Sequence, residues 1–417
     1  MVKKSIKKYN TFSGVFVPAF LTIIGVILYL RLGYVVGNAG ILGTLLIILI
    51  SVSITFCTAL SISSIITEIE VGSGGAYSII HKTLGKEIAG SVGIPFYLAQ
   101  AFSVAFYIFG FSEAWTYIFP NHPFLLVLIA TFVLLFLLTY ITTSLAVKTQ
   151  IVIFMIILLS LASVFLGDGL WFTKELVVPL FGAFQEMKFW SVFALFFPAV
   201  TGILAGIGLS GVLQNPKKQI RRGILSAIGI TTLIYIAVAV WFGFSAAPGQ
   251  LINDTRIMIK LAAFGPLVLL GVLSAAFSSA LVSFVAAPRL LRALANHKLI
   301  PFSSQFRKTT KNGEPRIANL FTSMIIIIIF ALGSLNIIAP ILTVLFLIIY
   351  IVINLAILIK QTRESFKPTF KVPRIIPIYG FVGSIILIFL ISAISGIVAL
   401  VSISLIYIIL AGINNTR

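Results

Sequence analysis

The stretch GVFVPAFLTIIGVILYLRLG, residues 14–33, is apolar and long enough to span a membrane, yet it contains a proline and an isolated glycine. A second run, FFPAVTGILAGIGLSG at residues 196–211, is interrupted in the same way. In hydrocarbon every backbone N–H and C=O group must be satisfied internally, so unwound backbone at membrane depth is stable only where it lines a polar cavity or a ligand. Paired breaks in two halves of a chain indicate the binding site of a secondary transporter. We therefore predict unwinding at Ile23–Gly25 and around Thr201–Ala205.

The composition is typical of a membrane protein. Hydrophobic residues make up 60% of the chain, charged residues only 9%, and the mean hydropathy is +1.17, which lies outside the soluble classes. The basic start MVKKSIKK leads into a span that is too long for a signal-peptide core, so no cleavable signal is expected. The single cysteine, Cys57, excludes an internal disulfide and leaves the redox compartment open.

Hydropathy over windows of about 19 residues predicts twelve membrane spans with short loops and no soluble domain. The predicted spans are 12–36, 41–65, 90–117, 123–143, 147–167, 190–213, 222–245, 266–295, 318–334, 337–359, 377–393 and 395–412.

The net charge of +19 would suggest nucleic acid as the partner of a soluble protein. The distribution of the charges indicates a membrane topology instead. With the N-terminus in the cytoplasm, 24 of the 29 Lys and Arg residues fall on the cytoplasmic side, four fall outside, and Arg31 lies in the membrane or at its interface. The positive-inside rule therefore predicts that both termini are cytoplasmic.

Acidic residues and histidines are absent from the middle of every predicted span. Proton-coupled pumps keep carboxylate relays there, and catalytic triads or metal centres would also need such groups. We therefore expect no enzyme, no cofactor and no resident metal. The polar groups left in the core are neutral oxygens, which suit Na⁺ and K⁺, and backbone amides at helix breaks, which suit anions. Two kinked packing helices without a ligand are the alternative, because Gly and Pro are common in membrane spans.

Four motifs occur in the order that is known from one transporter family. They are GVFVPAFLTIIGVILYLRLGYVVGNAG, GSGGAYSIIHKTLGKEIAGSVG, FFPAVTGILAGIGLSG and SSALVSFVAAPRLLRAL. Together they resemble the membrane domain of the cation–chloride cotransporters, within the amino acid–polyamine–cation superfamily, from about residue 12 to about residue 412. The resemblance implies an all-α, polytopic membrane protein of 12 transmembrane helices, with a LeuT-type 5+5 inverted repeat in which helices 1 and 6 are broken.

This resemblance also divides the chain. It implies a cytoplasmic N-terminus (1–11), a ten-helix transport core (12–359), a basic cytoplasmic loop (360–376), helices 11 and 12 (377–412) and a cytoplasmic C-terminus (413–417).

Ion ligands are implied residue by residue. The implied Na⁺ ligands are carbonyls of Leu21, Ile24 and Ala275 and hydroxyls of Ser278 and Ser279. The implied K⁺ ligands are carbonyls of Thr22, Ile23 and Pro198, the Thr201 side chain and the Tyr107 hydroxyl. Chloride is implied at the amides of Gly25, Val26 and Ile27, and at the amides of Gly202, Ile203 and Leu204 with the Tyr350 hydroxyl.

Several of these side chains also suit a purely structural role. Intramembrane serines such as Ser278 and Ser279 commonly bond back along their own helix or to a neighbouring one. A tyrosine such as Tyr107 is commonly an interfacial belt residue. The sequence also departs from the family in having Ile24 where sodium-potassium-chloride members carry Trp, and Thr22 where Asn is usual.

Three functions are compatible with the sequence. The first is a symporter in the cell membrane that couples Na⁺ and/or K⁺ to Cl⁻ by alternating access. The second is a permease for amino acids or another organic anion on the same scaffold, and the third is a channel-like or structural membrane protein. The expected partners are the lipid bilayer and small inorganic ions, and nucleic acid is not expected. The sequence is compatible with a homodimer.

Overall fold

The computed structural model describes residues 9–69, 74–141, 149–167, 175–184, 187–208, 213–310 and 313–415. Within these ranges the regular structure is helical, apart from one isolated β-bridge between Tyr9 and Leu213. The predicted all-α fold class is therefore confirmed. The outermost parts of the two predicted cytoplasmic termini, residues 1–8 and 416–417, lie outside the described residues.

The described part of the chain forms short helices of one or two turns and long helices. In order they are η1 (Phe12–Phe16), α1 (Val17–Ile23), α2 (Val26–Leu30), α3 (Leu32–Ile65), α4 (Ala76–Leu84), α5 (Lys86–Ile118), α6 (Phe124–Ile141), α8 (Gln150–Leu166), α9 (Phe189–Phe196), η3 (Phe197–Val200), α10 (Ile203–Gly208), α11 (Pro216–Ser245), α12 (Pro248–Asn253), α13 (Ile257–Leu261), α14 (Gly265–Asn296), α15 (Ser303–Phe306), α16 (Arg316–Phe330), α17 (Leu335–Gln361), α18 (Ile375–Ile391) and α19 (Ala393–Asn415).

Seven helical segments in the described part of the chain are long and apolar enough to cross a membrane. They are Phe12–Leu30, α3, α5, α11, α14, α17 and the Ala393–Gly412 part of α19. Five further apolar helices are shorter: Phe124–Tyr140, Gln150–Leu166, Phe189–Ala205, α16 and α18.

A kink at Gly40 lies between the first two predicted spans, 12–36 and 41–65. Helix α2 ends at Leu30, Arg31 leaves the helical conformation, and the residues from Leu32 to Ile65 form two helices that meet in a kink at Gly40. Gly40 has φ of +71°, and a Cβ there would lie 2.5 Å from the Gly182 backbone nitrogen. Glycine allows the left-handed backbone of this kink and the close contact with a distant loop, and hydropathy does not indicate that contact.

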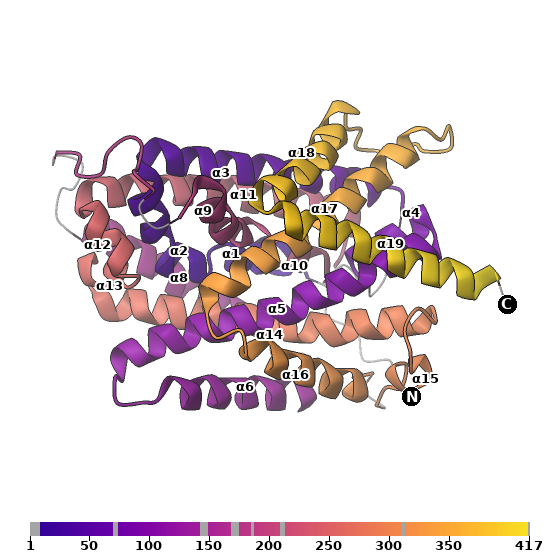
Figure 1. Cartoon of the computed structure of the whole chain (residues 1–417), viewed down its shortest axis with the longest axis horizontal. Coiled ribbons are helices and arrows are strands. Elements are labelled where there is room, and N and C mark those ends of the chain that lie inside the picture. Colours follow the sequence, from indigo (N-terminus) through magenta and orange to yellow (C-terminus); the bar gives the residue numbers. More distant parts are fainter. Residues whose placement is uncertain are drawn as a thin grey trace.

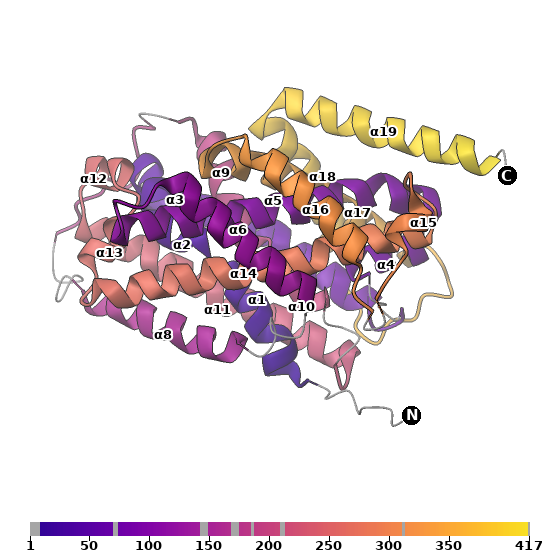
Figure 2. The ribbon, with the colours of Figure 1, turned by 90° about the horizontal axis from the view of Figure 1, so that it is seen from below.

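The two broken segments lie at the centre of the bundle. Figures 1 and 2 show α1 and α10 in its middle, between the long helices, and α1 contacts α8, α10, α11 and α14. In the best membrane-spanning window of Phe12–Leu30, 89% of the residues are buried, against 11% in that of Ala393–Gly412. The first segment is therefore enclosed by protein, whereas α19 presents its side chains outward.

The long helices run between two ends of the molecule. One end carries α4, α15 and the last turn of α19, and the other carries α12 and α13 (Figures 1 and 2). The loops at the first end are those predicted to be cytoplasmic. Which end faces the cytoplasm stays a prediction.

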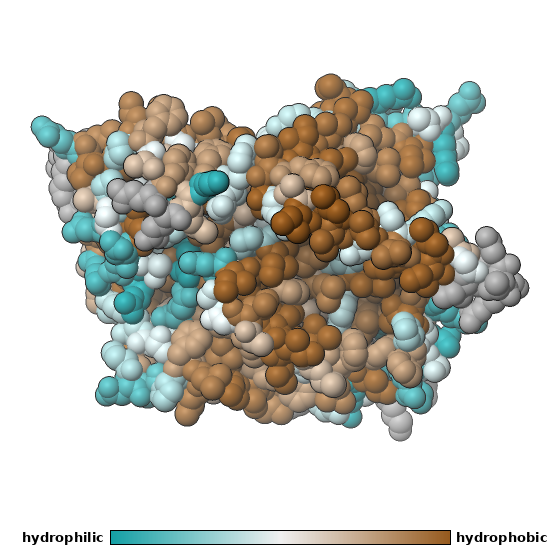
Figure 3. All heavy atoms as spheres, in the orientation of Figure 1, coloured by the Kyte–Doolittle hydropathy of each residue, from teal (hydrophilic) through white to brown (hydrophobic). Residues whose placement is uncertain are grey.

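Large apolar side chains cover the outside of the bundle. Figure 3 shows broad hydrophobic areas, with hydrophilic residues gathered towards the two ends. Leu125, Met155, Ile328 and Ile394, from four different helices, are 65%, 53%, 66% and 76% exposed. A water-soluble monomer rarely exposes so much apolar surface, so this belt is suited to lipid.

Candidate functional site

The first break lies between α1 and α2. Ile24 (φ −80°, ψ 72°) and Gly25 (φ −119°, ψ −154°) leave the helical conformation, and the Gly25 N–H donates to the Ile23 carbonyl at 2.9 Å. These angles at Ile24 are those of an inverse γ-turn. The helix therefore stops at Ile23, and α2 starts at Val26 with first amides that have no partner within the helix.

The second break is built around Pro198. Helix α9 ends at Phe196, the tighter turn η3 follows, and α10 starts at Ile203. Pro198 has no N–H to continue the helical ladder, and the Thr201 hydroxyl donates to its carbonyl oxygen at 2.8 Å. Two residues that were predicted to bind K⁺ are thus in direct contact with each other.

Gly202 is the point where the two breaks meet. A Cβ on Gly202 would lie 2.9 Å from the Thr22 Cβ and 3.0 Å from the Ile23 backbone nitrogen. Only a residue without a side chain allows the two backbones to come this close. The structure therefore brings together Thr22 and Ile23 of the first segment with Thr201 and Gly202 of the second.

Tyr107 reaches the first break from α5. A Cβ on Gly25 would lie 3.6 Å from the Tyr107 ring, and the Tyr107 hydroxyl interacts with the side chain of Ser279. Tyr107 is only 6% exposed. It is therefore a buried residue at the break and not a member of an interfacial belt.

Ser279 joins α14 to the first break. Its hydroxyl donates to the Leu21 carbonyl oxygen at 3.3 Å. Ser278 and Ala275 lie within the preceding turn of α14 and are buried. Four of the five residues predicted to bind Na⁺ thus lie on two helical segments that touch through this hydrogen bond, and the fifth, Ile24, is the first residue of the turn that follows α1.

Tyr350 approaches the second break from α17. Its side chain is fully buried, and its ring lies 6.1 Å from that of Phe197 in η3. The hydroxyls of Tyr350 and Thr55 are near each other, but neither has a hydrogen bond of ordinary geometry among the described residues. Leaving a buried hydroxyl without a partner costs about 1–3 kcal/mol, so a ligand that accepts a hydrogen bond would stabilise this arrangement.

Sequence reasoning missed Tyr235. This residue of α11 is buried, and its hydroxyl donates to the Ile23 carbonyl at 2.8 Å. A tyrosine inside the apolar run ITTLIYIAVAV at 230–240 was the available signal, because a buried tyrosine hydroxyl needs a partner.

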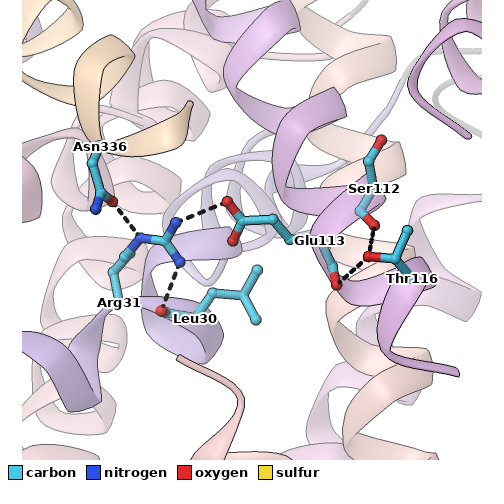
Figure 4. Close-up of polar contacts among 6 residues, drawn as sticks. All are labelled: Leu30, Arg31, Ser112, Glu113, Thr116 and Asn336. Carbon is cyan, nitrogen blue, oxygen red and sulfur yellow. Dashed lines mark hydrogen bonds and ion pairs between the residues drawn. The ribbon is translucent and has the colours of Figure 1, made fainter. Parts of the chain in front are cut away.

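Arg31 holds three elements together just beyond the first break (Figure 4). Its guanidinium is paired with the Glu113 carboxylate at 2.9 Å, and it donates to the Asn336 side chain at 2.8 Å and to the Leu30 carbonyl at 3.0 Å. Arg31 is 4% exposed, so this charge is compensated within the protein. The cluster connects the end of α2 with α5 and α17. The sequence indicates that Arg31 lies in the membrane or at its interface, but it does not indicate these partners.

Comparisons with known proteins show the family and the fold of the chain. Residues 14–416 match the family model described as amino acid permease. Human solute carrier family 12 member 2 is 32% identical over 430 aligned residues, which cover 88% of this chain and 36% of that protein. Human solute carrier family 12 member 1 is 34% identical over 408 aligned residues, which cover 83% of this chain and 37% of that protein. The chain thus spans little more than a third of the length of these relatives, which are transporters and not enzymes.

A solved structure of a Na⁺-coupled sialic acid symporter, in a substrate-bound outward-open state, has the same fold. Its TM-score is 0.54 at 12% identity, with 95% of this chain and 91% of that chain covered. The chain therefore belongs to the amino acid permease family, and its similarity to the family 12 solute carriers confirms the resemblance to the cation–chloride cotransporters.

Proposed function

We propose that the chain is a secondary active symporter that couples Na⁺ and/or K⁺ to Cl⁻ and binds these ions between its two helix breaks. One observation carries this proposal: hydroxyls from two helices donate to carbonyls at the first break, and a tyrosine ring from a third helix packs against it. Ser279 donates to Leu21, Tyr235 donates to Ile23, and Tyr107 lies against Gly25. A dehydrated alkali cation needs neutral oxygens, such as the carbonyls of this break, to replace its hydration shell.

The assignment of ions to residues follows the resemblance given above. In this proposal Na⁺ binds between the Leu21 carbonyl and Ser279, and K⁺ binds where Gly202 meets Ile23. Chloride binds at the amides that follow each break. The buried hydroxyl of Tyr350, which lacks an ordinary hydrogen bond in the described structure, supports the second anion site.

The membrane arrangement is part of the proposal. The seven long helices and the five shorter apolar ones would together provide twelve spans, arranged as two inverted repeats of five plus two further helices. The basic loops would face the cytoplasm, with both chain termini on that side of the cell membrane.

Uptake into proteoliposomes tests the function. We expect ⁸⁶Rb⁺ uptake that falls when Cl⁻ is replaced by gluconate, and that also falls when Na⁺ is omitted if sodium is coupled. Uptake that does not depend on chloride would overturn the proposal.

An amino-acid or organic-anion permease is the second candidate, because the matching family model describes amino acid permeases. The single Gly25 at the first break argues against it, because the resemblance to the superfamily implies a more glycine-rich stretch there in carriers that admit a carboxylate and an amine. Stabilisation of the protein by an amino acid, without a chloride requirement, would favour this second function.

A further inference from the structure

The Ile23 carbonyl is fully occupied by donors in this structure. It accepts the Gly25 N–H at 2.9 Å and the Tyr235 hydroxyl at 2.8 Å. A carbonyl oxygen has two lone pairs, so these two donors use its whole capacity. Any cation that binds to this oxygen must therefore replace one of them.

Of the two donors, the Gly25 N–H is the more difficult to displace. It closes the three-residue turn at Ile24, which sets the course of the chain from α1 to α2. The Tyr235 hydroxyl is different, because it can rotate about its C–O bond and turn its hydrogen away without any movement of the backbone.

The Tyr235 ring is held in place by both breaks. It packs edge-on against Phe196, the last residue of α9, with ring centroids 5.4 Å apart. It also lines a small cavity together with Ile23, Thr55 and Val200. The Tyr235 side chain therefore lies beside residues of both breaks.

We propose that Tyr235 is a positioning residue that holds the Ile23 carbonyl while no cation is bound and is displaced when a cation arrives. The inference rests on the function proposed above. The O–H dipole directs its positive end at the same oxygen that a cation would use, so the hydroxyl stabilises the empty site and competes with the ion. After a symporter releases its ions, its empty binding site must become accessible again from the side of the membrane where the ions bind. The Tyr235 hydroxyl would therefore favour this change of the empty protein and would lower its affinity for the cation.

Tyr235→Phe separates these effects, because it removes the hydroxyl and keeps the ring. We expect the half-saturating concentration of Rb⁺ to fall about three- to tenfold, because the cation no longer has to displace one neutral hydrogen bond. We also expect net uptake to fall relative to Rb⁺/Rb⁺ exchange, because exchange does not require the empty protein to return. Tyr97→Phe is the matched control, since the buried Tyr97 hydroxyl donates to Thr322 at 3.2 Å on α16.

Tyr235→3-fluorotyrosine tests the opposite direction and protects against a folding defect in the first variant. Its hydroxyl is a stronger donor, so the half-saturating concentration of Rb⁺ should rise.

Three results would overturn the inference. A higher half-saturating Rb⁺ concentration in Tyr235→Phe would make the hydroxyl a cation ligand. An unchanged concentration with an unchanged ratio of net uptake to exchange would make it structural only. The same change in Tyr97→Phe would make the effect unspecific. Failure of the proposed function gives a different result, because uptake of Rb⁺ by the wild-type protein would then be absent or would not depend on chloride.

Discussion

Ser279 and Leu21 lie 258 positions apart in the sequence and meet through a hydrogen bond of 3.3 Å, from the serine hydroxyl to the leucine carbonyl. Leu21 belongs to the last turn of α1, so its carbonyl lies where the helical ladder ends at the break. The serine therefore does not bond back along α14, which is the usual arrangement for a buried serine in a helix. It reaches instead to the segment that we propose binds the ions.

We predict that Ser278→Ala combined with Ser279→Ala abolishes the Na⁺ dependence of uptake. Two side-chain oxygens near a dehydrated cation would be lost, at a cost of about 1–3 kcal/mol each if both are ligands. The measurement is ⁸⁶Rb⁺ uptake against Na⁺ concentration. Ser112→Ala is a suitable control, because this buried serine bonds back to the Ile108 carbonyl at 2.9 Å. A normal sodium response in the double variant would assign the serine pair to helix packing.

Removing the two tyrosine hydroxyls should affect different ions. Tyr107→Phe is expected to raise the half-saturating Rb⁺ concentration, and Tyr350→Phe the half-saturating Cl⁻ concentration, each by about tenfold or more. The rings remain, so the amount of folded protein should change little. Each variant serves as the control for the other. If both variants raised the half-saturating concentrations of Rb⁺ and of Cl⁻ equally, the result would contradict separate sites for the two ions.

The local parts of the site could be predicted from the sequence. Pro198 has no N–H and Gly25 lacks a side chain that would favour the helix, so both mark places where a membrane helix can open. The serines of α14 were found only through the family resemblance. Their partner Leu21 is a plain apolar residue that takes part through its backbone.

The remaining parts depend on contacts between distant segments. Nothing next to Tyr235 in the chain indicates that its hydroxyl meets Ile23, and a buried tyrosine could equally pack elsewhere. The pairing of Arg31 with Glu113 and the contact of Gly40 with Gly182 are of the same kind. Hydropathy locates such residues along the chain but does not say which segments face each other.

Breaking the Arg31–Glu113 pair should destabilise the protein. Glu113→Gln leaves the buried guanidinium without its counter-charge, and because the Glu113 side chain is 25% exposed the expected loss is about 1–3 kcal/mol, below that of a fully buried pair. Thermal unfolding in detergent measures the loss. In a double-mutant cycle with Arg31→Gln, the double variant should be more stable than the sum of the single losses predicts. Additive losses would show that the two charges are not coupled.

The histidine pair that joins α4 to the end of α14 should make this contact sensitive to acid. The rings of His81 and His297 lie 3.8 Å apart, and burial lowers the pKa of both imidazoles, with nearby Lys86 acting in the same direction. A pKa that is lower in the folded than in the unfolded protein means that the unfolded protein binds more protons in acid. The free energy of unfolding should therefore fall as the pH drops below about 6.5.

Melting temperatures between pH 8 and pH 5 measure this effect in detergent. In the double variant His81→Gln, His297→Gln the slope between pH 7 and pH 5 should become shallower. The same slope in the variant and the wild type would attribute the acid sensitivity to other groups.

Gly202→Ala tests whether the two breaks must touch. The new Cβ would lie 3.0 Å or less from Thr22 and from the Ile23 backbone nitrogen, and the backbone cannot give way as a flexible side chain could. Overpacking of this kind costs about 1–3 kcal/mol. We expect a lower melting temperature and a loss of uptake that higher Na⁺, K⁺ or Cl⁻ concentrations do not restore.

Gly229→Ala is the matched control, because a Cβ at this exposed position of α11 meets no atom within 4 Å. Since alanine suits a helix better than glycine by roughly 0.5–1 kcal/mol, Gly229→Ala should keep its uptake and its stability. Normal uptake by Gly202→Ala would mean that the ions do not bind where the two breaks meet.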